Sequence, residues 1–182
     1  MSDFEKAVDF VLNHEGGLIE NPNDPGGITK YGISLRFLRE VDPNRLRRYG
    51  IFDCVMDETI RILTLDQAKF IYRGEFWEGN NFDQIHSQNL CSYVFDMAVA
   101  HGVNQAIKLI QRGLWAIHYT RDYLRADGIL GEQTIGELNA LGDRFLAVIV
   151  AVRGEFYRHV AAIRNEEHVF LDGWLNRCYS VF

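Results

Sequence analysis

The chain has 182 residues, 47% of them hydrophobic, so it can bury a core as one domain or as two small lobes. It carries 19 Lys and Arg residues against 25 Asp and Glu residues, and its formal net charge of −6 gives no overall attraction to nucleic acid or to an anionic membrane. The longest apolar run, residues 145–152, is far shorter than the roughly 20 residues of a membrane span. We therefore expect a globular protein with no nucleic-acid partner and no stable membrane insertion.

The first predicted element is a helix over residues 3–15, which Gly16 and Gly17 end. Glu15 follows Val11 by four residues, so it continues the apolar face of this helix. We expect its side chain to be partly desolvated, a condition under which a carboxyl group keeps its proton near neutral pH. Glu15 is therefore the candidate general acid. The face consists of Phe4, Ala7, Val8, Val11 and Leu12.

A dense cluster of turn-forming residues occupies positions 21–27, with short apolar pieces on either side. This composition predicts a small hairpin or Ω-like loop that folds back over the end of the first helix. Such a loop can place Asp24 or Thr29 opposite Glu15. Taken singly, Asp24 fits an ordinary turn residue and Glu15 an ordinary helix end, and both interpretations stay open at this point.

Shorter helices are predicted next. Ser34 is placed to cap a helix through Val41, residues 46–49 form a further helical turn, and Thr64 with Gln67 forms a capping box for a helix over residues 65–77. Several aromatic residues gather near the end of that helix, where we expect most of them to pack in the core. Trp77, beside polar residues at the helix end, is equally well placed to line a saccharide cleft.

The second half of the chain is predicted to be helical as well. Apolar residues recur at helical spacing over residues 88–101, from Asn104 to residue 117, over residues 143–163 and over residues 170–175. On the first of these faces, His101 fits a buried or interface histidine with satisfied hydrogen bonds better than a catalytic one. The fold class that follows is mostly α-helical.

Residues 127–134, Asp-Gly-Ile-Leu-Gly-Glu-Gln-Thr, form the other conspicuous loop. Gly128 and Gly131 suit a tight turn, and the Glu and Thr that follow suit the start of a helix. For Asp127 and Gly128, ordinary helix capping and direct contact with a glycan are equally weighted alternatives.

Three cysteines, Cys54, Cys91 and Cys178, are too few and too widely spaced for a disulfide framework. Each lies among apolar residues, so we expect three buried, reduced thiols. The sequence contains no Cys-x-x-Cys motif and no closely spaced His pair, and we expect no metal and no other cofactor. Charged residues from Asp3 onward interrupt the N-terminal hydrophobics, so we expect no ordinary signal peptide.

The run Glu15-Gly16-Gly17, then residues 21–27, Thr29 and residues 31–34, resembles the signature of the phage-type N-acetylmuramidases of glycoside hydrolase family 108. The resemblance implies a lysozyme-like helical fold with a small β-hairpin or loop at the active site. It also implies that Glu15 is the catalytic acid, that Asp24 is a base or electrostatic stabiliser, that Thr29 positions water, and that Tyr31 contacts substrate.

Residues 95–102, followed by Gln105 and Ala106 and by the loop at 127–134, resemble the peptidoglycan-binding region that accompanies the muramidase region in this family. The resemblance implies a catalytic region over residues 1–87 and a helical C-terminal lobe over residues 88–182, packed against it. Asp127 and Gly128 are the corresponding candidate glycan contacts, and Trp77, from its place at a helix end in the first region, is a further candidate.

The implied activity is hydrolysis of the β-1,4 bond between N-acetylmuramic acid and N-acetylglucosamine, with inversion or retention left open. The alternatives are a lytic transglycosylase and a non-catalytic peptidoglycan-binding adaptor. The resemblance extends to phage endolysins and to muramidases of protein or toxin export. We expect a monomer that is synthesised in the cytoplasm, is released with a holin or an export system, and acts on peptidoglycan in the periplasm or cell wall.

Overall fold

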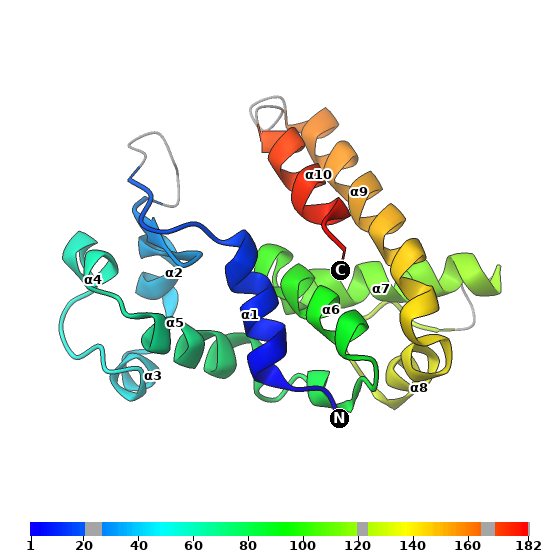
Figure 1. The fold of residues 1–182 in the computed structure, drawn as a ribbon, viewed down its shortest axis with the longest axis horizontal. Helices are drawn as coiled ribbons and strands as arrows, with labels where there is room; N and C mark the ends of the chain where they lie inside the picture. The colour runs from blue at the N-terminus through cyan, green and yellow to red at the C-terminus, as the bar shows by residue number, and fades with distance from the viewer. Residues whose placement is uncertain (21–26, 120–123, 165–169, 182) are drawn as a thin grey trace.

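The computed structural model describes residues 1–20, 27–119, 124–164 and 170–181. Within them the chain is mostly helical with one two-stranded antiparallel sheet (Figure 1). The α-helices and strands, in order, are α1 (Phe4–His14), β1 (Thr29–Lys30), β2 (Ile33–Ser34), α2 (Leu35–Glu40), α3 (Pro43–Arg48), α4 (Asp57–Arg61), α5 (Leu65–Tyr72), α6 (Gln88–His101), α7 (Val103–His118), α8 (Glu132–Leu141), α9 (Leu146–Ile163) and α10 (Leu171–Tyr179).

Helix α1 begins and ends where the sequence indicates. The Asp3 carboxylate accepts hydrogen bonds from the backbone N–H groups of Glu5 at 2.7 Å and Lys6 at 3.4 Å, which satisfies donors that the first helical turn leaves without partners. On its inner face Phe4, Ala7, Val8 and Val11 are buried and Leu12 is partly buried, and the helix packs against α6. At the other end, Glu15 has extended backbone angles while its N–H still donates to the Val11 carbonyl at 3.2 Å.

The predicted hairpin is formed by β1 and β2, which pair in the register Thr29 with Ser34 and Lys30 with Ile33. Tyr31 and Gly32 connect them with φ angles of +52° and +75°, and positive φ at both central residues is the signature of a type I′ hairpin turn. Ile19 forms an isolated bridge with Thr29, with N–O distances of 2.8 and 3.0 Å. The segment after α1 is thus tied to the hairpin.

Both predicted helix caps are confirmed. The Ser34 hydroxyl accepts from the Phe37 N–H at 3.1 Å, and Thr64 and Gln67 form a reciprocal capping box at 3.2 and 3.0 Å. The helix that begins at Leu65 continues to Trp77 as predicted, but its last turn, Arg73–Trp77, is a π-helix. Helix α4 was not predicted.

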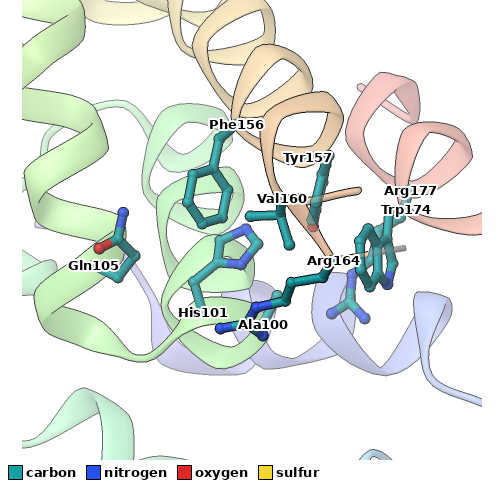
Figure 2. Close-up of a pocket in the computed structure, with 9 residues that line it drawn as sticks. All are labelled: Ala100, His101, Gln105, Phe156, Tyr157, Val160, Arg164, Trp174 and Arg177. Carbon is teal, nitrogen blue, oxygen red and sulfur yellow. The ribbon is translucent and has the colours of Figure 1, made fainter. Parts of the chain in front are cut away.

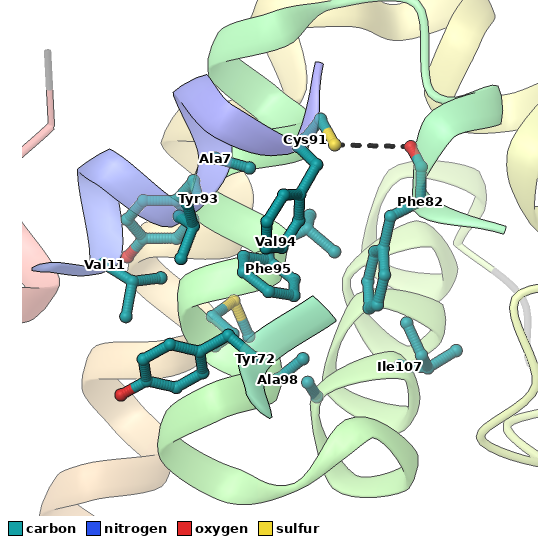
Figure 3. Close-up of a cluster of buried hydrophobic side chains, with 14 of the residues drawn as sticks. Ala7, Val11, Tyr72, Phe82, Cys91, Tyr93, Val94, Phe95, Ala98 and Ile107 are labelled. Atoms are coloured by element: carbon teal, nitrogen blue, oxygen red, sulfur yellow. Dashed lines mark hydrogen bonds between the residues drawn. The ribbon is translucent and has the colours of Figure 1, made fainter. Parts of the chain in front are cut away.

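Helix α6 is the centre of the molecule. It packs against α1 on one side and α7 on the other, α7 packs against α9, and α9 against α10. Figure 1 shows α1 and α6 in the middle of the molecule, with α2 to α5 on one side of them and α7 to α10 on the other. Figure 3 shows the core around α6, where the Cys91 thiol donates to the Phe82 carbonyl at 3.3 Å. The labelled core residues include Tyr93, Val94, Phe95 and Ile107, all fully buried.

The prediction of three buried thiols is wrong for one of them. Cys91 and Cys178 are buried, but Cys54 is exposed. It lies in the irregular segment between α3 and α4, where its neighbour Phe52 is 73% exposed, so apolar neighbours in sequence do not form a core there.

No helix within the described parts of the chain is long and apolar enough to cross a bilayer. The expected division between residues 87 and 88 falls at Ser87, the N-cap of α6. Helix α6 packs against both α1 and α7, so its contacts do not assign it to one region alone. The division at residues 87 and 88 stays a prediction.

Candidate active site

Glu15 lies at the C-terminal end of α1 with its side chain 18% exposed, so it is partly desolvated as expected. Its nearest charged group is a cation from the far end of the sequence. Arg177 of α10 donates from Nη1 to Glu15 Oε1 at 2.6 Å. The ion pair compensates the partly buried carboxylate and joins the end of α1 to α10.

The hairpin turn covers the other side of the Glu15 carboxyl group. A Cβ added at Gly32 would lie 2.6 Å from Glu15 Cδ and 2.7 Å from Oε2, so the Gly32 backbone is in direct contact with the carboxyl group. The Tyr72 hydroxyl donates to the Tyr31 carbonyl at 2.8 Å and also leaves no room for a side chain at Gly32. Glu15 is therefore held between the hairpin turn and α10.

A buried charge network continues behind Arg177. Asp96 of α6 is fully buried and accepts from Arg177 Nη2 at 2.7 Å and Nε at 3.1 Å, while Arg153 Nη1 of α9 lies 2.8 Å from its other oxygen. Burial by itself raises the pKa of Asp96, but the charges of Arg177 and Arg153 outweigh burial, so the pKa lies below its ordinary value. Asp96 is therefore ionised at neutral pH, and α6, α9 and α10 are linked to Glu15 through charges.

Of the other predicted site residues near this end of the chain, Thr29 and Tyr31 belong to the hairpin. Asp24 is outside the described residues. Thr29 is a half-buried residue of β1 whose hydroxyl donates to the Gly27 carbonyl at 3.4 Å. Tyr31 occupies the hairpin turn with its ring partly buried, and Lys30 Nζ lies 5.5 Å from the ring centroid.

Trp77 packs among aromatic rings at the opposite end of α1. Its ring centroid lies 5.3 Å from that of Phe4 and 5.2 Å from that of Phe95, both in edge-to-face geometry. Phe4 opens α1 and Glu15 follows its last residue, and eleven helical residues span about 16 Å. The structure does not bring Trp77 to Glu15.

Asp127 and Gly128 form a loop far from Glu15 in the sequence, and their contacts lie within that loop and with α7. Asp127 Oδ1 accepts from the Ile129 N–H at 3.0 Å and from Gln111 Nε2 at 2.9 Å, and these bonds lower the pKa of Asp127. Gly128 has a φ of +82° and packs against Asn104. These contacts account for loop structure, and direct glycan contact stays a prediction.

His101 is only partly as expected. It is largely buried, and burial, with a smaller effect from the charge of Arg153, lowers its pKa to about 3. Its Nε2 atom, however, is buried with no hydrogen-bond partner among the described residues, which differs from the satisfied histidine that the sequence predicts. Within the same residues, no group of three or more His, Cys, Asp or Glu side chains is arranged to hold a metal ion.

Sequence reasoning missed Gly32, Arg177, Asp96 and Arg153. Asp96 and Arg153 did carry a signal, because each is a single charge within a long apolar stretch of a predicted helix, and buried charges occur in pairs. Arg177 carried none, since 162 residues separate it from Glu15.

Comparisons with known proteins identify the family of the chain. Residues 8–102, more than half of the chain, match the family model described as Glycosyl hydrolase 108. The chain belongs to glycosyl hydrolase family 108. It is thus a glycoside hydrolase, as the motif around Glu15 predicts, and residues 105–179 of this family 108 chain match a second model described as Predicted Peptidoglycan domain.

The chain is also similar to a solved structure described as Brucella abortus SagA. The two share 24% sequence identity with a TM-score of 0.72, over 96% of this chain and 88% of that one. At this identity the likeness concerns the fold, and it confirms the expected lysozyme-like helical architecture. A comparison with curated protein sequences gave no match.

Proposed function

We propose that this family 108 glycoside hydrolase is an N-acetylmuramidase, which cleaves the β-1,4 bond between N-acetylmuramic acid and N-acetylglucosamine in peptidoglycan. The observation that carries the proposal is the Glu15 carboxyl group, partly desolvated and held between the hairpin turn and Arg177. The predicted peptidoglycan domain at residues 105–179 supports the substrate class.

In the proposed mechanism, Glu15 protonates the oxygen of the leaving sugar. Arg177 Nη1 contacts Oε1, and Oε2 is the oxygen on the Gly32 side. Two contacts on opposite sides of one carboxyl group restrict its rotation, and such positioning is a large part of what a catalytic acid contributes. Proton donation by a positioned side chain typically accelerates a reaction by about 10²- to 10⁴-fold.

The second carboxylate of the proposal is Asp24. The anomeric carbon gains positive charge in the transition state, and Asp24 either stabilises that charge or activates a water on the opposite face of the sugar. A separation of about 5 to 5.5 Å from Glu15 leads to retention, and roughly 6.5 to 9.5 Å leaves room for the water of an inverting reaction. Thr29, on the first hairpin strand, is proposed to position that water, and Tyr31 to contact the glycan.

Mass spectrometry of digested cell walls tests the reaction. A muramidase releases fragments that end in a reducing N-acetylmuramic acid. Fragments ending in anhydromuramic acid, together with full activity of Asp24→Asn, would instead identify a lytic transglycosylase, in which the muramic acid 6-hydroxyl attacks. Absence of any cleavage by the wild-type protein, with binding retained, would identify a wall-binding adaptor.

The biological setting belongs to the same proposal. The protein is synthesised in the cytoplasm, leaves it through a holin or an export system, acts on peptidoglycan as a monomer, and serves either phage-type lysis or wall remodelling for protein or toxin export. Fractionation of cells with and without a candidate holin tests the holin route. If the holin releases the protein, the protein should be found in the wall fraction only when the holin is present.

A further inference from the structure

The guanidinium group of Arg177 is shared between two carboxyl groups of different exposure. Its Nη1 atom donates to Glu15 Oε1 at 2.6 Å, while its Nη2 and Nε atoms donate to Asp96 at 2.7 and 3.1 Å. The Glu15 side chain is partly exposed, whereas that of Asp96 is completely buried. One edge of the guanidinium group therefore faces the buried aspartate, and Nη1 is the atom that reaches the candidate acid.

A cation beside Glu15 opposes the role of a proton donor. Arginine stays charged at every pH of an activity assay. An opposite charge close to a carboxyl group favours its ionised form, whereas a general acid must hold its proton until the leaving oxygen takes it. Contact with Arg177 alone would thus favour the wrong protonation state of Glu15, and an anion close to Arg177 would offset this effect.

Asp96 supplies such an anion. The charges of Arg177 and Arg153 hold the pKa of Asp96 below its ordinary value in spite of burial, so Asp96 is ionised at neutral pH. Arg153 Nη1 lies 2.8 Å from Asp96 Oδ2. The charges therefore alternate in sign from Arg153 through Asp96 and Arg177 to Glu15. Without Asp96, this series would contain two cations and no anion other than the candidate acid.

Other groups near the pair were compared with Asp96. Tyr72 contacts the hairpin turn beside Glu15, and burial raises the pKa of Tyr72, so its hydroxyl is neutral. Arg177 also lines a cavity of about 450 Å³ between the α6–α7 corner and helices α9 and α10 (Figure 2). None of the described residues that line it carries a carboxylate. His101 is neutral there because burial lowers its pKa to about 3, and Arg164 is a cation.

We propose that Asp96 is a positioning residue for the reaction and acts through Arg177. It holds the guanidinium group so that Nη1 fixes Glu15 Oε1, and its negative charge offsets the effect of Arg177 on the proton of the acid. The inference rests on the proposed function, because it takes Glu15 as the general acid. Arg177 and Asp96 therefore have opposite effects on the protonation of Glu15.

The pH dependence of kcat on cell walls tests the proposal, because activity is lost at high pH, where the acid has no proton. Arg177→Gln removes the cation, so this alkaline limb should move to higher pH, by about 1 to 3 units. Asp96→Asn keeps an oxygen that accepts from Arg177 but removes the anion, so the limb should move to lower pH. Asp24 is the same in every variant, and its own titration does not enter the comparison.

Tyr93→Phe is the matched control. It removes the buried hydrogen bond of 2.8 Å from α6 to the Cys178 carbonyl of α10 without changing a charge, so the limb should stay in place. Circular dichroism at each pH confines the comparison to folded protein. If Asp96→Asn does not fold, the double variant with Arg153→Met removes the buried cation together with its anion and should move the limb in the same direction.

Alkaline limbs that coincide in all variants, or that move in the same direction for Arg177→Gln and Asp96→Asn, would overturn the proposal. A purely structural role lowers kcat without opposite shifts. Carbon-13 NMR titration of the Glu15 carboxyl carbon, assigned from the signal that Glu15→Gln removes, gives the same comparison without turnover. If the wild-type protein does not cleave walls, the muramidase is contradicted, and the NMR midpoints still decide whether Asp96 and Arg177 act on Glu15 in opposite directions.

Discussion

Gly32 has no room for a side chain, because its backbone contacts the Glu15 carboxyl group and the Tyr72 hydroxyl. Its φ of +75° also disfavours any residue with a Cβ. We predict that Gly32→Ala lowers kcat on cell walls at least tenfold, because Glu15 must shift, and lowers the free energy of unfolding by about 1 to 3 kcal/mol. Turnover assays and urea unfolding measure the two effects.

Gly79 is the matched control for Gly32. Its φ of +77° is nearly the same, but an added Cβ meets no described atom within 4 Å. Gly79→Ala should therefore cost roughly 1 kcal/mol of stability from backbone strain and leave kcat unchanged. If the two variants lose activity equally, Gly32 has no special role beside Glu15.

At the residue scale, sequence reasoning found Glu15 because its position depends on local information, the spacing from Val11 and the two glycines that follow. The groups that touch it could not be found in this way. Arg177 reaches Glu15 only because α10 folds back over α9, and Gly32 reaches it only because the hairpin turn closes over the end of α1. Both contacts are set by tertiary packing.

Elements were predicted where their ends carry capping residues, as at Ser34 and Thr64. Helix α4 was missed because it has five residues and its N-cap is Met56, which is not a usual capping residue. The π-helical turn after α5 was not predicted, because the periodicity of apolar residues does not distinguish it from an α-helix; within this turn, Gly74 packs directly against the Tyr49 side chain. Capping residues and apolar spacing predict where a helix begins and which face is buried. They do not predict local changes of helix geometry such as the π-helical turn.

The charged side chains of Asp96, Arg153 and Arg177 join helices α6, α9 and α10. From this network we predict how the free energy of unfolding depends on pH. Asp96→Asn should lower the free energy of unfolding at neutral pH by about 3 to 5 kcal/mol, because it leaves the buried Arg153 without an anion. Urea unfolding of both proteins between pH 2.5 and about 7 measures the difference.

The pH dependence of that difference follows from the direction of the pKa shift. The pKa of Asp96 is lower in the folded protein than in the unfolded chain, so the folded state binds fewer protons. Its contribution is complete above the unfolded value of about 3.9 and is lost as the pH falls through the folded value. The gap between wild type and Asp96→Asn should therefore narrow only below about pH 4, and a gap independent of pH would contradict this account.

At the scale of the whole molecule, the catalytic and peptidoglycan regions share one framework. Helix α6 packs against both α1 and α7, and Arg177 joins α10 to the end of α1. Tyr93 of α6 also donates to the Cys178 carbonyl of α10 at 2.8 Å. These contacts bury the groups that connect the two regions, so neither region retains its packing when the other unfolds.

We therefore predict a single unfolding transition in urea. Single-tryptophan variants that retain either Trp77 in the first half or Trp115 in the second should report the same midpoint, and far-UV circular dichroism should coincide with both. Two separated midpoints would show that the regions fold independently.

The most direct test of Glu15 as the acid compares Glu15→Gln on two substrates. Glutamine preserves an oxygen that can accept from Arg177 but cannot supply the proton, so cleavage of cell walls should fall by at least about 10²-fold while the fold is maintained. On an aryl glycoside whose leaving phenolate needs no proton, the variant should retain most of the wild-type rate. Wild-type rates on cell walls, or equal losses on both substrates, would contradict the role of Glu15 as proton donor.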